Sequence, residues 1–252
     1  MGEEQRKNTL LFTVAMLAVT TFGPAGYEQY GKRCLETLKT CFPGKIVAFY
    51  EQKPDIEGID LRDFFAIPGV NEYLERLKRN PGASGFGPDG YDYRYDANKF
   101  CRKVFAQEAV FDEDQYVFWI DADCVALKPM PEEFMRSLVA DVPFCYLGRK
   151  GELAYTETGF LGFNTKHEKF PEFRSRYLSY MTSGKIFTQL KGWHDCIAFD
   201  YARQGIQGLN LTKDGSGVGN VIGESRMGKY LTHLKGPRKF SDVKRCAPSS
   251  PA

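Results

Sequence analysis

The chain has 252 residues, a formal net charge of +2 at pH 7, 42% apolar residues and 14% aromatic residues. Its length and apolar content suit one α/β domain with a sizeable core, and the near-balanced charge argues against a dedicated nucleic-acid-binding surface or a polybasic membrane anchor. The seven cysteines are scattered without a CxxC or a metal-type spacing, so we expect reduced thiols and a cytoplasmic protein.

The first predicted element is a β-strand over residues 9–22, an apolar run that is too short to span a bilayer. Mixed charges rather than a basic segment precede it, so we expect a soluble protein with no secretion signal and no membrane span. A glycine-containing turn over residues 23–26 and a helix from about Tyr27 to Thr40 follow, which is how α/β nucleotide sites begin. Tyr27 and Tyr30, at the start of this helix, could stack on a base or could be ordinary core or surface aromatics.

The second predicted strand covers residues 45–50. Glu51 stands at its carboxyl end, where an acid could accept hydrogen bonds from a ribose or a base, or could simply face solvent. An amphipathic helix is predicted over residues 97–110. Lys103 lies near the apolar side of this helix, so its ammonium group could reach a diphosphate or could belong to a solvated basic face. Between the two elements we expect a turn with helical pieces over residues 54–78 and a long surface loop over residues 80–90.

The most informative segment is an apolar run over residues 117–120 that leads directly into Asp121 and Asp123. The run is typical of a buried strand, and ligands of open α/β folds bind where such strands end. If the chain stays extended, the two aspartates point to the same side and can share one hard cation and the phosphates it carries. A second acidic segment of the same form, Asp112-Glu113-Asp114, is interpreted as a solvated turn.

Two further segments carry polar side chains near predicted strand or helix ends. Asp195 follows His194 at the start of a predicted helix, where it could be a capping acid or a site residue. His233 precedes Lys235, which offers a ring nitrogen for a metal and an ammonium group for a phosphate. The other predicted elements are a helix over 131–138, strands over 143–149 and, after a turn, up to 164, a helix over 170–183 and a mobile glycine-rich loop over 205–228.

Four segments, in this order, resemble those of metal-dependent nucleotide-sugar glycosyltransferases of the GT-A fold, and in particular glycogenin-like and related bacterial or phage-type enzymes: Asp121-Ala122-Asp123, Glu157-Thr158-Gly159-Phe160, Trp193-His194-Asp195 and His233-Leu234-Lys235-Gly236. The similarity extends from about Thr9 to Lys239. It implies a single GT-A domain over residues 1–240, with a mostly parallel sheet flanked by helices, and leaves residues 241–252 as a flexible tail. The chain lacks the Lys-Pro-Trp that follows in glycogenin-like enzymes, so the sugar and the acceptor do not carry over.

The resemblance implies a role for each matching position. Asp121, Asp123 and His233 would hold a divalent cation, Mn²⁺ or Mg²⁺, although Asp121 could contact the ribose instead of the metal. Glu157 and Asp195 would face the sugar and the acceptor, either as the base of an inverting reaction or as stabilisers of an oxocarbenium-like centre in a retaining one. The donor would be a UDP- or GDP-linked hexose. The acceptor stays open between a glycan, a protein side chain, a lipid-linked sugar and a modified nucleic-acid base. The predicted donor-binding residues are Thr20, Thr21, Phe22, Tyr27, Glu51, Lys103, Asp121, Ala122, Lys235 and Gly236.

Two other functions fit the same residues. Phosphatases of the haloacid-dehalogenase type also place an Asp-x-Asp segment after an apolar strand, and there Asp121 would be the nucleophile. Against this, about 120 residues precede the segment, and no clear acidic pair follows a later helix. The third hypothesis is a non-catalytic protein that binds a nucleotide sugar.

Overall fold

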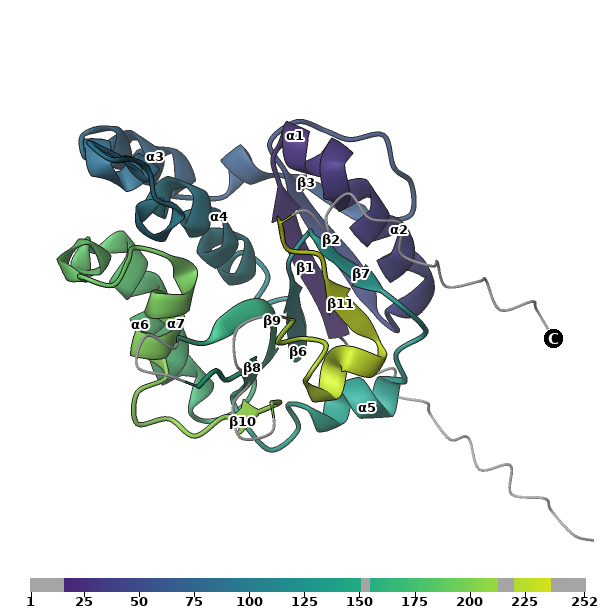
Figure 1. The fold of residues 1–252 in the computed structure, drawn as a ribbon. Helices are drawn as coiled ribbons and strands as arrows, with labels where there is room; N and C mark the ends of the chain where they lie inside the picture. Colours follow the sequence, from purple (N-terminus) through teal and green to yellow (C-terminus); the bar gives the residue numbers. More distant parts are fainter. Residues whose placement is uncertain (1–15, 151–154, 213–219, 237–252) are drawn as a thin grey trace, which may run out of the picture.

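A mostly parallel β-sheet forms the centre of the protein (Figure 1). The computed structural model describes residues 16–150, 155–212 and 220–236. Parallel pairs outnumber antiparallel ones in this sheet, because only the strand over Glu157–Asn164 runs antiparallel to both of its neighbours. The predicted α/β class is therefore confirmed. The seven strands lie in the order β10 (Leu209–Asn210), β8 (Phe144–Leu147), β9 (Glu157–Asn164), β6 (Tyr116–Ile120), β1 (Met16–Phe22), β2 (Lys45–Tyr50) and β3 (Asp60–Asp63).

Helices cover both faces of this sheet (Figure 1). Alternate residues of β1 belong to two separate cores, with Leu17 and Val19 in one and Met16 and Ala18 in the other, as the two-residue period of a strand requires. The first core contains the buried faces of α3 (Val70–Lys78), α4 (Ala97–Glu108), α6 (Phe170–Thr182) and α7 (Asp195–Ala202). The second contains those of α2 (Lys32–Cys41), α5 (Glu132–Ser137) and the two-stranded ribbon of β7 (Cys124–Ala126) and β11 (Leu231–His233).

The first helix begins earlier than the sequence predicts. A short helix, α1 (Pro24–Gly26), continues through a π-helical turn, η1 (Tyr27–Gly31), into α2. Gly23 is its extended N-cap residue and Pro24 occupies the first helical position, where the missing proline N–H costs no hydrogen bond. The prediction of a turn over residues 23–26 was therefore wrong, and the strand before it is confirmed for Met16–Phe22, since residues 9–15 lie outside the described ranges.

The segment between β2 and α4 contains more regular structure than predicted. Strand β3 was missed, and the 3₁₀ helix η2 (Phe64–Ala66) follows it. The predicted surface loop contains the 3₁₀ helix η3 (Pro81–Ser84) and a hairpin of β4 (Phe86–Gly87) and β5 (Gly90–Tyr91), and η4 (Tyr93–Tyr95) follows the hairpin. The remaining 3₁₀ helices are η5 (Lys185–Thr188) and η6 (Arg226–Lys229).

Two predictions fall wholly or partly outside the described residues. The tail over residues 241–252 is one, and residues 213–219 of the predicted mobile loop are the other. Within the described ranges, no helix is both long enough and apolar enough to cross a membrane. The six cysteines of these ranges are free thiols, as predicted; five of them are buried and Cys196 is half-buried.

Candidate metal and nucleotide site

The Asp121-Ala122-Asp123 segment forms a tight turn and not an extended chain. Strand β6 is buried along its whole length and ends at Ile120. The backbone N–H of Cys124 donates to the Asp121 carbonyl at 2.9 Å, which closes the turn and starts β7. The N–H of Asp121 donates to the Gly159 carbonyl at 2.9 Å, so β9 fixes the position of the first aspartate.

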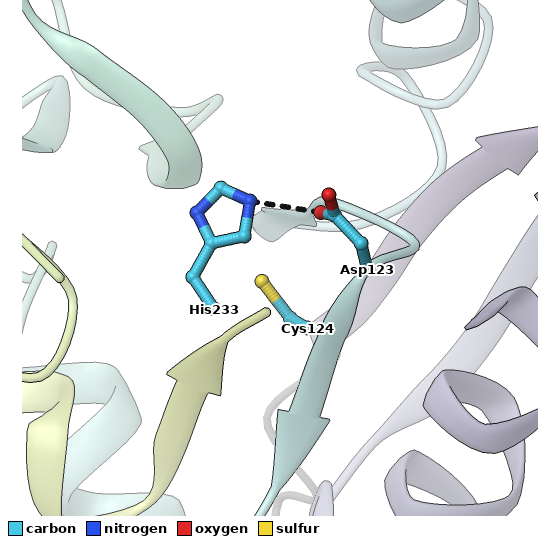
Figure 2. A group of neighbouring side chains, drawn as sticks. All are labelled: Asp123, Cys124 and His233. Carbon is cyan, nitrogen blue, oxygen red and sulfur yellow. Dashed lines mark ion pairs between the residues drawn. The ribbon is translucent and has the colours of Figure 1, made fainter. Parts of the chain in front are cut away.

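His233 reaches this turn because β11 pairs antiparallel with β7, with His233 opposite Cys124. The next backbone N–H, of Leu234, donates to the Asp123 carbonyl at 3.0 Å and extends the pairing to the turn itself. Figure 2 shows the imidazole ring directed toward the Asp123 carboxylate, with the Cys124 side chain beside them. The ring is 4% exposed and lies 2.8 Å, Nε2 to Oδ1, from Asp123.

The ligand atoms around His233 fit a divalent cation. In an octahedral shell with metal–ligand distances of about 2.1 Å, neighbouring ligand atoms lie roughly 3 Å apart and opposite ones roughly 4.2 Å apart. The Nε2 atom of His233 lies 2.8 Å from Asp123 Oδ1, which suits two neighbouring ligands of one ion, and 3.8 Å from Asp121 Oδ2, which lies between the two separations. Carboxylate oxygens with one imidazole nitrogen suit Mn²⁺ better than Ca²⁺.

His233 is shared by two clusters of metal-ligating side chains. On one side it groups with Asp123 and Cys124, and on the other with Asp121 and Glu157, with the ligand atoms of each set within 4.8 Å of one another. Burial raises the pKa of the Cys124 thiol well above its usual value, and the nearby Asp123 and Asp121 carboxylates add to this. The protonated thiol donates to the Gly159 carbonyl at 3.7 Å, so the oxygen and nitrogen atoms are the better ligands.

Two positively charged side chains bind the Glu157 carboxylate. Its carboxylate accepts hydrogen bonds from Arg149 and from Lys235, and its Oε1 atom lies 3.7 Å from His233 Nδ1. Burial alone would raise the pKa of this carboxyl group, but Lys235, His233 and Arg149 lower it to about 2. Glu157 is therefore ionised at neutral pH, and the Lys235 ammonium group, predicted to bind phosphate, is paired with it.

A second buried ion-pair network lies beside the turn. The Lys103 ammonium group lies 2.8 Å from Asp121 Oδ1 and 2.8 Å from Asp195 Oδ2, and it donates to the Thr158 carbonyl at 3.0 Å. Burial alone would lower the pKa of Lys103, but the two carboxylates raise it well above its usual value. Burial would likewise raise the pKa of Asp195, but Lys103 and His194 lower it. Lys103 thus fixes one oxygen of Asp121 and leaves the other toward His233.

One cavity of about 530 Å³ brings most of the predicted residues together, a volume in the usual range for small-molecule sites. It lies at the carboxyl ends of β1 and β6, as ligand sites of open α/β sheets do. Its lining includes five basic side chains, Lys99, Arg102, Lys103, Arg149 and Lys235. The predicted residues that line it are Thr21, Phe22, Lys103, Asp121, Ala122, Asp123, Glu157, Asp195, His233, Lys235 and Gly236.

Three predicted donor-binding residues do not line this cavity. The Thr20 side chain is buried in the sheet at 1% exposure. Tyr27 packs on Phe22, with ring centroids 5.2 Å apart, and its hydroxyl donates to the Asp55 carbonyl at 3.3 Å. Glu51 forms an ion pair with Arg102, which does line the cavity.

Because the first helix begins earlier than predicted, Tyr27 does not line the cavity. Tyr30, three residues later in the π-helical turn, lines the cavity in its place.

Several lining residues were missed by the sequence analysis. Arg149 follows β8, so the strand-end argument that selected Glu51 would also have selected it. Thr158 lies inside the Glu157-Thr158-Gly159 segment, and its hydroxyl donates to Asp195. The aromatic residues Tyr93 and Tyr155 line the cavity too, but no local signal in the sequence marks them.

The chain matches no protein-family model and no curated protein. It is similar in structure to the apo form of the glycosyltransferase GlyE of Streptococcus pneumoniae TIGR4 (10% identity, TM-score 0.45, 78% of this chain and 45% of that chain). A second GlyE crystal structure gives 12% identity, a TM-score of 0.44, and coverage of 81% and 45%. Apo mouse xyloside xylosyltransferase 1 gives 10% identity, a TM-score of 0.48, and coverage of 78% and 84%. The chain thus spans less than half of the length of each GlyE chain.

Proposed function

We propose that this protein is a glycosyltransferase that moves a sugar from a nucleoside-diphosphate sugar to an acceptor, with a divalent cation held by Asp121, Asp123 and His233. The observation that supports this is the approach of His233 Nε2 to both aspartates, at 2.8 Å and 3.8 Å, in one corner of a cavity lined by five basic side chains. A cation site beside basic side chains suits a diphosphate, because the diphosphate carries negative charge and hard oxygen ligands.

The cation would neutralise the charge that develops on the departing nucleoside diphosphate. Lys99 and Arg102 line the same cavity and would hold the phosphates, Arg102 while also paired with Glu51, whereas Lys103 is engaged by two carboxylates. Lys103 would act on the metal site by fixing Asp121. Phe22 and Tyr30, at the carboxyl end of β1 and in the first helix, would flank the nucleoside.

Asp195 and Glu157 would act near the transferred sugar through their charge. Asp195 is paired with Lys103 and Thr158, and Glu157 with Arg149 and Lys235. A carboxylate that is held by cations is a weak base, whereas its fixed negative charge can stabilise an oxocarbenium-like centre. This arrangement favours electrostatic stabilisation over proton abstraction for both residues.

The phosphatase hypothesis requires Asp121 to attack phosphorus through a carboxylate oxygen. In this structure the Oδ1 atom of Asp121 accepts from Trp119 Nε1 at 2.7 Å and lies 2.8 Å from Lys103 Nζ. The other oxygen, Oδ2, faces His233. Oδ1 is thus engaged within the protein, and Oδ2 faces the imidazole nitrogen that would share the cation, which favours a ligand role for Asp121.

A thermal-shift panel tests the proposal. UDP, GDP and their hexose conjugates are each added with Mn²⁺, with Mg²⁺ or with chelator. A saturating nucleotide should raise the melting temperature by about 5–10 °C in the presence of metal only. Release of nucleoside diphosphate during turnover would then separate a transferase from a non-catalytic binder. No response to any nucleotide, together with hydrolysis of p-nitrophenyl phosphate, would favour the phosphatase.

A further inference from the structure

Exposed aromatic side chains gather on one segment of the chain. Among the described residues, five large hydrophobic side chains are exposed, and three of them are Phe86 (66%), Tyr91 (49%) and Tyr93 (51%). Phe86 and Tyr91 are paired across the β4–β5 hairpin, with ring centroids 5.1 Å apart. Tyr93 follows two residues later, so its Cα lies within about 7 Å of that of Tyr91. Exposed apolar surface of this kind commonly marks a binding site.

This aromatic segment is continuous with the cavity of the candidate site. Tyr93 lines the cavity, and its hydroxyl lies 3.3 Å from the hydroxyl of Tyr155, another lining residue. The Tyr155 ring in turn packs edge-on against His194, with centroids 4.6 Å apart. We define Phe86, Tyr91, Tyr93 and Tyr155 as the aromatic wall. It leads from the interior of the cavity to the exposed hairpin.

We propose that the aromatic wall binds a carbohydrate acceptor, a neutral oligosaccharide whose reactive hydroxyl enters the cavity. This inference rests on the proposed function. The acceptor hydroxyl must come within about 3.5 Å of the reacting carbon of the transferred sugar, and this carbon would lie in the same cavity as the proposed metal site. The rest of the acceptor must then leave the cavity, and the aromatic wall has two members in the lining, Tyr93 and Tyr155, and two on the exposed hairpin next to it in the chain.

The chemistry of the wall favours a sugar over a nucleic acid or a lipid tail. Sugars present C–H faces to aromatic rings and hydroxyl groups to polar partners, and tyrosine offers both a ring and a hydroxyl. A nucleic acid would need unpaired basic groups along the path, but Arg94 is paired with Asp92 at 2.6 Å. A lipid tail would need a long aliphatic groove, whereas the wall consists of aromatic rings with three hydroxyl groups.

The test measures binding of neutral malto-, xylo-, galacto- and chito-oligosaccharides to the full chain by saturation-transfer-difference NMR. Binding of UDP and GDP with Mg²⁺ is measured on the same samples. The variants are Tyr93→Ala, Tyr93→Phe and the double variant Phe86→Ala/Tyr91→Ala. Phe65→Ala is the matched control, because Phe65 is also exposed (38%) but does not line the cavity.

We expect one class of oligosaccharide to bind. Tyr93→Ala and the double variant should weaken this binding by about tenfold, which corresponds to about 1.4 kcal/mol. Tyr93→Phe should keep most of the affinity because it keeps the ring, and Phe65→Ala should change nothing. Metal-dependent nucleotide binding with no oligosaccharide binding, or equal oligosaccharide affinity in all variants, would overturn the carbohydrate assignment alone. Absence of nucleotide binding as well would overturn the proposed function.

Discussion

Replacing Gly159 with alanine should damage the metal site without touching a ligand. A Cβ atom at Gly159 would lie 2.7 Å from His233 Nδ1 and 2.8 Å from its Cε1. Ordinary contact begins near 3.4 Å, so the ring would have to retreat by about 0.7 Å. Metal–ligand distances are held to within about 0.2 Å, and the ring is 4% exposed, so a retreat of this size moves Nε2 out of the coordination shell.

The expected loss can be given a magnitude. Disturbing a group that orients a metal ligand typically lowers metal affinity by about 10- to 100-fold, and we expect this range for Gly159→Ala. Forcing one methyl group into packed surroundings should also cost about 1–3 kcal/mol of unfolding free energy. Mn²⁺ titration followed by electron paramagnetic resonance measures the first effect, and urea unfolding measures the second.

A matched glycine provides the control. A Cβ atom at Gly87 would meet nothing within 4 Å, so Gly87→Ala should bind Mn²⁺ as the natural protein does. If Gly159→Ala bound Mn²⁺ with unchanged affinity while remaining folded, His233 would not be a ligand in the position described. The structural reasoning behind the site would then be refuted.

Two predictions concern ion pairs, one beside the proposed metal site and one at the edge of the sheet. Lys103→Met should lower the unfolding free energy by about 3–5 kcal/mol in urea unfolding, because it leaves the carboxylates of Asp121 and Asp195 without their cation; a loss below about 1 kcal/mol would contradict the ion-pair network. Asp60 accepts hydrogen bonds from Arg62, which lowers its pKa from 3.8 to about 2. A carboxylate with a lowered pKa stabilises the fold above pH 3.8, and this stabilisation is lost as the pH falls toward 2. Because Asp60 is one-third exposed, Asp60→Asn should lower the unfolding free energy by about 1 kcal/mol at pH 7 and hardly at all near pH 2. A cost that did not change with pH would show that the effect is not electrostatic.

The central strands could be predicted because each is a continuous apolar run. Residues 45–50 and the run before Asp121 have no competing interpretation in an α/β chain, and both form strands. Strand β3, Asp-Leu-Arg-Asp, has no such run. It is an edge strand that pairs only with β2, and its charged residues are stabilised by Lys45 and Glu113 from distant segments. Only the tertiary structure supplies those partners.

Site residues could be predicted where polar side chains follow the ends of strands. They were harder to predict where the role of a side chain depends on its ion-pair partner. Asp121, Asp123 and His233 were predicted as metal ligands, and His233 Nε2 approaches each aspartate, although the two aspartates fall into different clusters around it. The engagement of Lys235 with Glu157, 78 residues apart, could not be read from either segment. Tyr27 was predicted to lie at the nucleoside because the helix was expected to begin there, but the helix begins earlier and Tyr30, not Tyr27, lines the cavity.

The measurement that tests the central claim most directly is calorimetric titration of UDP and GDP in Mn²⁺ into the natural protein and Asp123→Ala. The second Asp-x-Asp segment offers a control, Asp112→Ala, because the Asp112 side chain is 81% exposed. We predict Mn²⁺-dependent binding of one nucleotide to the natural protein and to Asp112→Ala. Asp123→Ala should unfold at a similar temperature but lose at least about 100-fold in affinity. Unchanged nucleotide binding by folded Asp123→Ala would contradict the metal site and, with it, the proposed function.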